Sequence, residues 1–144
     1  MEIIKYPNKI LEKRARKVKD PLDGEIQKLV KNMISTMNEA SGAGLAAPQI
    51  GQSLRICTIQ CDGEIFVLIN PKITAYSREK EINEEGCLSF PGKFIPVKRS
   101  TKIKARYLDE KGNEIKIKAE GMLARIIQHE TDHLNGILFI NRKS

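Results

Sequence analysis

The two histidines of this 144-residue sequence are four residues apart, in the segment Gln128-His129-Glu130-Thr131-Asp132-His133. On an α-helix, residues four apart lie on one face, about 6 Å apart along the axis, so both imidazoles could bind one metal ion. Glu130 would lie beside the pair, where a carboxylate can hold a metal-bound water without being a ligand. The alternative is a surface helix with a chance spacing, and it is weakened because the sequence has no other histidine.

A metal site on this helix needs a third protein ligand. One class of metalloproteases supplies it through H-E-x-x-H-x-x-G-x-x-H, but here Phe139 stands where the third histidine would be. A second class uses a downstream glutamate, and no acid, histidine or cysteine follows His133. The third ligand must therefore lie upstream, as a carboxylate or as one of three cysteines, Cys57, Cys61 and Cys87.

Cys87 is the best candidate among the cysteines. Cys57 and Cys61 lie in a β-branched run that predicts a strand, on one face of it, as expected of small residues packed in a core. Cys87 follows Gly86, which lets the backbone come close to another group. A thiolate is a strong metal ligand, and metal binding would itself deprotonate the thiol.

Three segments resemble, in order and spacing, the motifs of the peptide deformylases, enzymes that remove the formyl group from the initiator methionine of nascent chains. They are Gly42-Ala-Gly-Leu-Ala-Ala-Pro-Gln49, Glu85-Gly-Cys-Leu-Ser89 and Gln128-His-Glu-Thr-Asp-His133. The resemblance extends from Tyr6-Pro7 to about Phe139. It implies a metal-dependent hydrolase that releases formate from N-formylmethionyl peptides, and it assigns these roles: metal ligands Cys87, His129 and His133, general acid and base Glu130, and an oxyanion hole of Gln49 and the backbone N–H of Leu88.

These roles combine into one expected mechanism. Three protein ligands leave one coordination position for a water, whose pKa the metal lowers toward neutrality. The resulting hydroxide would attack the formyl carbon, and Glu130 would pass the proton to the departing amine. Gln49 and the Leu88 N–H would stabilise the oxyanion. From the residues alone, Gln49 is better explained as a turn residue after Pro48, so its role depends on the resemblance.

The ligand types do not identify the metal. Cysteine and histidine suit zinc, iron, cobalt and nickel. The family implies Fe(II) as the physiological ion, with oxidation of the iron or of Cys87 as a cause of lability.

The resemblance also implies that the substrate binds as an extended strand, through main-chain groups near Ala43, Gly44 and Gly86. A need for positive φ explains each glycine equally well. Ala43 is smaller than the branched residue usual between these glycines, which predicts a more open wall.

Two other charged residues lie near the histidines. Arg125 is four residues before His129, and we expect its side chain to extend into solvent rather than toward the substrate. We expect Asp132 to support the site or lie at the surface, not to bind the metal.

Length and composition predict one soluble domain, residues 1–144, that buries about two-thirds of its unfolded surface. No run of eighteen apolar residues and no signal peptide is present, so no membrane contact is expected. Three cysteines without scaffold spacing favour a reducing, cytoplasmic location.

The net charge is +7, with a basic run of Lys13, Arg14, Arg16, Lys17 and Lys19. Such a run is most often a solvated face. Without intercalated aromatic residues, no specific nucleic-acid binding is expected. The sequence also lacks the C-terminal helical extension of many bacterial members, so only a transient ribosome contact is retained as a candidate.

The pattern of apolar residues predicts an α+β fold in which short antiparallel sheets pack around a central metal-bearing helix. The expected elements are a helical turn within Pro7–Val18, a long N-terminal amphipathic helix from Asp23 to about Ala40, a hairpin of Ser53–Cys61 and Glu64–Asn70, extended chain through Pro71–Glu81, a second hairpin of Lys102–Leu108 and a return strand ending at Ala119, and a helix from about Met122 to Leu134.

Two rival functions belong to other classes. One is a minimal endopeptidase of the H-E-x-x-H type, against which the missing downstream ligand and the short chain argue. The other is a basic, metal-stabilised binding module without turnover, in which Glu130 would be incidental.

Overall fold

The computed structural model describes every residue from 1 to 144. It has the predicted α+β character, with two α-helices, seven strands and three short 3-10 helices. In chain order these are η1 (Lys9–Glu12), α1 (Gly24–Glu39), β1 (Gly44–Ala46), η2 (Ala47–Ile50), β2 (Ile56–Cys61), β3 (Glu64–Tyr76), β4 (Lys80–Cys87), β5 (Phe90–Ser100), β6 (Lys102–Leu108), β7 (Glu114–Glu120), α2 (Gly121–Leu134) and η3 (Phe139–Arg142).

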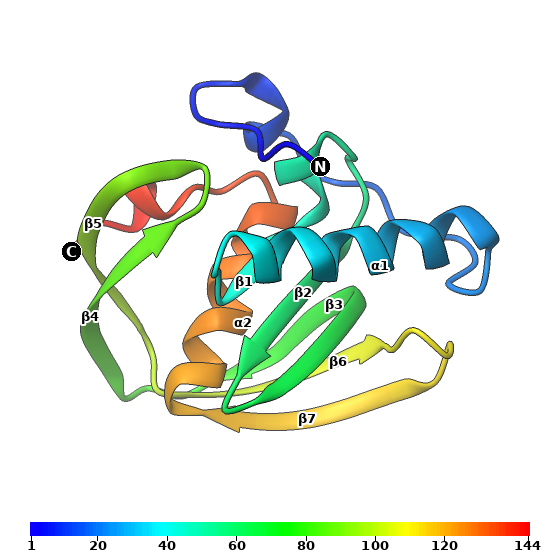
Figure 1. Cartoon of the computed structure of the whole chain (residues 1–144). Helices are drawn as coiled ribbons and strands as arrows, with labels where there is room; N and C mark the ends of the chain where they lie inside the picture. The colour runs from blue at the N-terminus through cyan, green and yellow to red at the C-terminus, as the bar shows by residue number, and fades with distance from the viewer.

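The strands form two antiparallel sheets. The larger has the strand order β1-β2-β3-β6-β7, and β4 and β5 make a separate two-stranded sheet. Figure 1 shows α2, in orange, between the two sheets, while α1 crosses in front of the larger one. The helix that carries both histidines is therefore central, as the sequence predicts.

The larger sheet is covered on both faces over β1 to β3. On one face, α1 contributes apolar residues at helical spacing, including Leu29, Met33 and Met37, which pack against Val67 and Ile69 of β3. On the other face, α2 packs against the sheet through a second apolar cluster. Its members include Ala124, Ile127, Leu134, Cys57, Ile59, Ile103 and Tyr107. The prediction that Cys57 and Cys61 are core residues is confirmed, because their exposed fractions are 0% and 9%.

The helix α2 is enclosed along most of its length. Every residue from Ala124 to Leu134 is buried, including six polar or charged ones between Gln128 and His133. Buried polar groups are costly unless they have partners, so the surroundings of α2 must supply them. None of the helices is long and apolar enough to span a bilayer.

The β4–β5 hairpin was not predicted. The sequence indicates extended chain only as far as Glu81, whereas β4 and β5 form a hairpin from Lys80 to Ser100. Its strands lack a clear apolar alternation, because most β4 side chains are exposed and charged or polar, and two prolines and a glycine interrupt β5. This hairpin supplies the second wall of the site.

Candidate active site

The three predicted metal ligands lie together. α2 presents His129 and His133 one turn apart, and the end of β4 brings in Cys87. Their candidate ligand atoms all lie within 4.8 Å of one another, and Cys87 Sγ is 3.3 Å from His133 Nε2. The three side chains thus converge on one point, although Cys87 lies 42 positions before His129 in the sequence.

The strand geometry explains how Cys87 is aimed. Residues two apart on a strand share a face, so Glu85 and Cys87 both face α2. The pairing of β4 with β5 shifts register between these two residues. Such irregularities re-aim side chains at the end of a ladder, and here Cys87 is half-buried at the head of a cavity.

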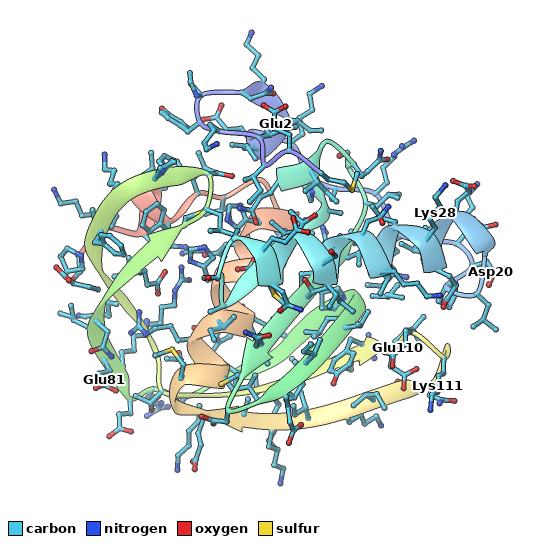
Figure 2. All side chains as sticks on the ribbon, viewed as in Figure 1. Glu2, Asp20, Lys28, Glu81, Glu110 and Lys111 are labelled. Carbon is cyan, nitrogen blue, oxygen red and sulfur yellow. The ribbon has the colours of Figure 1, made fainter.

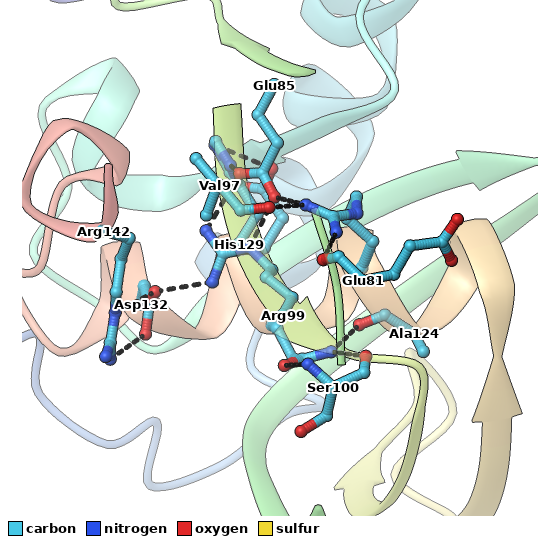
Figure 3. A network of polar contacts seen from close by, with 12 residues as sticks. Glu81, Glu85, Val97, Arg99, Ser100, Ala124, His129, Asp132 and Arg142 are labelled. Atoms are coloured by element: carbon cyan, nitrogen blue, oxygen red, sulfur yellow. Dashed lines mark hydrogen bonds and ion pairs between the residues drawn. The ribbon is translucent and has the colours of Figure 1, made fainter. Parts of the chain in front are cut away.

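The outer nitrogen of His129 is held by a carboxylate (Figure 3). His129 Nδ1 lies 2.9 Å from Glu85 Oε1, which leaves Nε2 directed at the cluster. Arg99 donates from Nε to Glu85 Oε2 at 2.6 Å and from Nη1 to Asp132 Oδ2 at 2.9 Å. A carboxylate behind a histidine fixes the orientation of the ring and increases its basicity as a ligand.

The same contacts set the charge states around the histidines. Burial alone would raise the pKa of Glu85, but hydrogen bonds from His129 and Arg99 lower it to about 2. Burial also acts to lower the pKa of His129, but contacts with Cys87 and Glu85 raise it to about 10. Burial lowers the pKa of His133, so its imidazole is in the neutral form that binds metals.

The expectation that Arg125 extends into solvent is wrong. Its exposed fraction is only 8%, and its guanidinium donates to Glu85, to the carbonyl of Val97 at 3.0 Å and to the carbonyl of Glu81 at 2.7 Å. The acceptors belong to the β4–β5 hairpin, whose existence the sequence did not reveal. A buried guanidinium with this many acceptors ties the hairpin to α2.

Asp132 supports the site through Arg99, which also holds Glu85. It is 8% exposed and accepts hydrogen bonds from Arg99 and from Nε and Nη2 of Arg142, as Figure 3 shows. Of the two alternatives for this residue, support of the site is correct.

Glu130 lies beside the histidines and outside the ligand cluster. Its Oε2 is 4.0 Å from His129 Nε2, and its buried Oε1 has no protein partner. Burial raises the pKa of this carboxyl to about 7, against the opposing effect of His129. A carboxyl that titrates near neutrality is suited to accept a proton and return it.

The side chain of Gln49 lies beside the cluster of candidate ligands. Its Oε1 accepts from the N–H of Ala46 at 2.9 Å, which fixes the side chain in the short helix η2. Its Nε2 lies 3.1 Å from Ser89 Oγ and 3.6 Å from Cys87 Sγ. The amide therefore points into the cluster, and the side chain is 1% exposed. The backbone N–H of Leu88, next to Cys87, has no backbone acceptor.

A cavity of about 530 Å³ opens in front of the cluster. Its lining includes Gly42, Ala43, Gly44, Gly86, Cys87, His129 and Glu130. A Cβ on Gly44 would lie 2.5 Å from Glu130 Oε2, and one on Gly86 would lie 2.6 Å from the Phe94 ring. Neither glycine has a positive φ. Both positions therefore need glycine because another side chain packs directly against the backbone, and not because the backbone has a positive φ.

The donor set fits one divalent ion. Tetrahedral bonds of about 2.0–2.3 Å would separate two ligand atoms by roughly 3.5 Å, close to the 3.3 Å between Cys87 Sγ and His133 Nε2. The orphaned Glu130 Oε1 beside the donors also indicates a polar partner at this point. A metal bound at His129 Nε2 would displace the proton there.

A family model described as polypeptide deformylase matches residues 1–144. The chain belongs to the polypeptide deformylase family. The peptide deformylase of Clostridium botulinum is 48% identical over 97% of this chain and 94% of its own length. That of Thermodesulfovibrio yellowstonii is 45% identical over 100% of this chain and 89% of its own length.

Solved deformylase structures share the fold. The structure from Thermotoga maritima has a TM-score of 0.97 at 41% identity, and the match covers 99% of this chain and 97% of that one. The structure from Synechococcus elongatus, in complex with actinonin, has a TM-score of 0.96 at 39% identity and covers 100% of this chain and 79% of that one. The α+β fold expected from the pattern of apolar residues is thus confirmed.

Sequence reasoning missed Glu85 and Arg99, although both touch the site. The available signal was the spacing of Glu85, which precedes Cys87 by two residues and so shares its strand face. Nothing in the sequence pairs Arg99 with either carboxylate, because Glu85 is 14 residues and Asp132 is 33 residues away along the chain.

Proposed function

We propose that this chain is a metal-dependent hydrolase that removes the N-formyl group from the formyl-methionine of nascent polypeptides and releases formate. The observation that supports it most is the convergence of Cys87, His129 and His133, at the head of the cavity, with the unpartnered carboxylate of Glu130 and the buried amide of Gln49. Membership of the deformylase family supports the same reaction.

Cys87, His129 and His133 would hold one divalent ion. We propose Fe(II) as the physiological ion, with zinc, nickel or cobalt able to occupy the same ligands. When bound, such an ion supplies Lewis acidity, which polarises a carbonyl and lowers the pKa of water.

The remaining steps belong to the residues of the chain. Glu130 accepts the proton of the attacking water and delivers it to the amine as the C–N bond of the formamide breaks. Gln49 Nε2 and the Leu88 N–H donate to the formyl oxygen as it gains negative charge. Formate and a free amino terminus leave the site.

The substrate would bind as an added strand. β1 and β4 each pair with only one other strand, so each has a free edge, and both border the cavity through Gly44 and Gly86. An extended peptide can use the main-chain groups of Ala43, Gly44 and Gly86 along these edges. The exposed side chain of Ala43 leaves that wall open. We place the reaction in the cytoplasm, with the ribosome as a transient partner.

The reaction can be tested directly. Metal-loaded protein is incubated with a formyl-Met peptide and with the same peptide lacking the formyl group, and both formate and peptide fragments are measured. We expect formate from the first peptide only, no internal cleavage, and inhibition by actinonin, which the Synechococcus relative binds. Protein stripped by a chelator is the control.

The other outcomes identify the rival functions. Internal cleavage of either peptide would indicate an endopeptidase. Full metal occupancy with neither product would indicate a binding module and would contradict the proposal.

Gln49→Leu should lower kcat by roughly 10²–10³-fold and change KM much less, because the amide interaction strengthens only as charge develops on the oxyanion. Steady-state kinetics with a formyl-Met peptide measure both constants. Metal content and melting temperature serve as controls for folding. Turnover within a fewfold of the unsubstituted protein would mean that Gln49 only fixes η2.

A further inference from the structure

The outer face of the larger sheet is only partly covered. α1 packs over β1 and β2 and contacts apolar β3 residues such as Val67 and Ile69. Farther along β3, and on β6 and β7, the same face is exposed and cationic. Figure 1 shows β6 and β7 at the lower edge of the molecule, below α1. We call this surface the basic face, made of Lys72, Lys104, Arg106, Lys116 and Lys118, all exposed.

The strand register places these cations opposite one another. Lys72 pairs with Arg106, and Arg106 pairs with Lys116, which makes a row of three across β3, β6 and β7. Lys104 pairs with Lys118 in the adjacent row. Residues directly opposite across antiparallel strands have adjacent side chains, and like charges in such pairs destabilise a sheet.

No carboxylate compensates this repulsion. None of the five cations forms an ion pair. The two acids of β7, Glu114 and Glu120, lie at its two ends, and Glu120 is 3.9 Å from Lys102. Figure 2 shows two further charged residues, Glu110 and Lys111, out on the turn between β6 and β7. The centre of the face is therefore uniformly positive.

The face is also hollowed. A depression of about 410 Å³ lies between the two rows, lined by Thr74, Lys104, Arg106, Lys116, Ile117 and Lys118. Lysines two apart on a strand are about 6.7 Å apart, and neighbouring strands are about 4.8 Å apart, so the cations form a compact grid.

We infer that the basic face binds the phosphate backbone of double-helical RNA. A grid of unpaired cations matches a ligand with closely spaced negative charges, which would relieve the repulsion within the rows. No aromatic side chain belongs to the grid, whereas binders of single-stranded RNA stack bases on aromatic residues. No large apolar side chain projects from the grid either, as membrane-inserting surfaces require. The binding is independent of RNA sequence and of the proposed hydrolysis.

The test compares two double variants with the same change in net charge. Lys104→Gln/Lys118→Gln removes one cross-strand pair of the basic face, and Lys9→Gln/Lys13→Gln removes two exposed lysines near η1, at the opposite end of the molecule in Figure 1. Binding of a labelled RNA duplex is followed by fluorescence anisotropy at several salt concentrations.

We expect the basic-face variant to bind duplex RNA at least about tenfold more weakly and to reduce the salt slope of log K by about 2, since two phosphate contacts are lost. The Lys9→Gln/Lys13→Gln variant should bind duplex RNA with an affinity within a fewfold of that of the unsubstituted protein. The basic-face variant should melt no lower and keep its hydrolytic activity, because a repulsive pair is removed and no site residue is touched.

Three results would overturn the inference. One is equal loss of duplex binding in both double variants. Another is binding of single-stranded oligouridine as tight as that of the duplex. The third is loss of binding to phosphatidylserine vesicles in the basic-face variant while duplex binding is unchanged.

Discussion

Glu130→Gln should lower kcat by roughly 10³- to 10⁴-fold while the protein keeps its full metal content. Glutamine has the shape of glutamate but cannot accept the proton of the attacking water or return it to the amine. Glu130 lies outside the cluster of three ligands, so metal binding should not depend on it. Kinetics with a formyl-Met peptide and metal analysis of the same sample measure both quantities.

The surroundings of Glu130 make glutamine the better substitution. The backbone of Gly44 packs directly against this carboxylate, so the shorter side chain in Glu130→Ala would open a gap beside the cluster. Comparison of the two variants separates lost chemistry from lost packing, since only the alanine variant should also lose stability. Near-normal turnover in either variant would place the general base elsewhere.

Cys87→Ala should abolish stoichiometric metal binding, and with it all activity. Two imidazoles alone hold a divalent ion weakly, and the alanine variant has no other side chain positioned to replace the thiolate. Metal content after gel filtration is the measurement. Full occupancy in this variant would contradict the ligand assignment.

Cys57→Ala is the matched control. Cys57 is fully buried in the apolar cluster between α2 and the sheet, so its loss removes one thiol without touching the site. This variant should retain one metal ion per chain. Cys87→Asp extends the test, because an oxygen ligand in place of sulfur should shift the preference toward harder ions.

Local spacing accounts for what the sequence could predict. Helical periodicity defines α1 and α2, the Asp62-Gly63 turn defines the β2–β3 hairpin, and the four-residue spacing of the histidines places them on one face. Cys87 follows by elimination among few candidates. All of these depend on residues close together in the chain or on residue types that are rare in it.

Contacts between distant elements account for what could not be predicted. Arg125 follows the rule for an amphipathic helix and was expected at the surface, but the β4–β5 hairpin covers that side of α2. Glu85, Arg99 and Asp132 come from three elements, and no local pattern pairs them. The residues next to Gln49 in the sequence predict only a turn. The direction of its amide depends on contacts with Ala46 and Ser89 that appear only in the folded chain.

The enclosure of α2 has a consequence for how the chain unfolds. Every residue from Ala124 to Leu134 is covered by the larger sheet, by the β4–β5 hairpin or by adjacent chain, and Arg99 and Arg125 join the hairpin to the helix. If the β4–β5 hairpin detached from α2, Arg125 and Asp132 would lose their buried partners Glu85 and Arg99. An unpartnered buried charge is costly, so this detachment is unfavourable. We therefore expect the two sheets to unfold together as one cooperative unit, with the amides of α2 exchanging with solvent only on global unfolding.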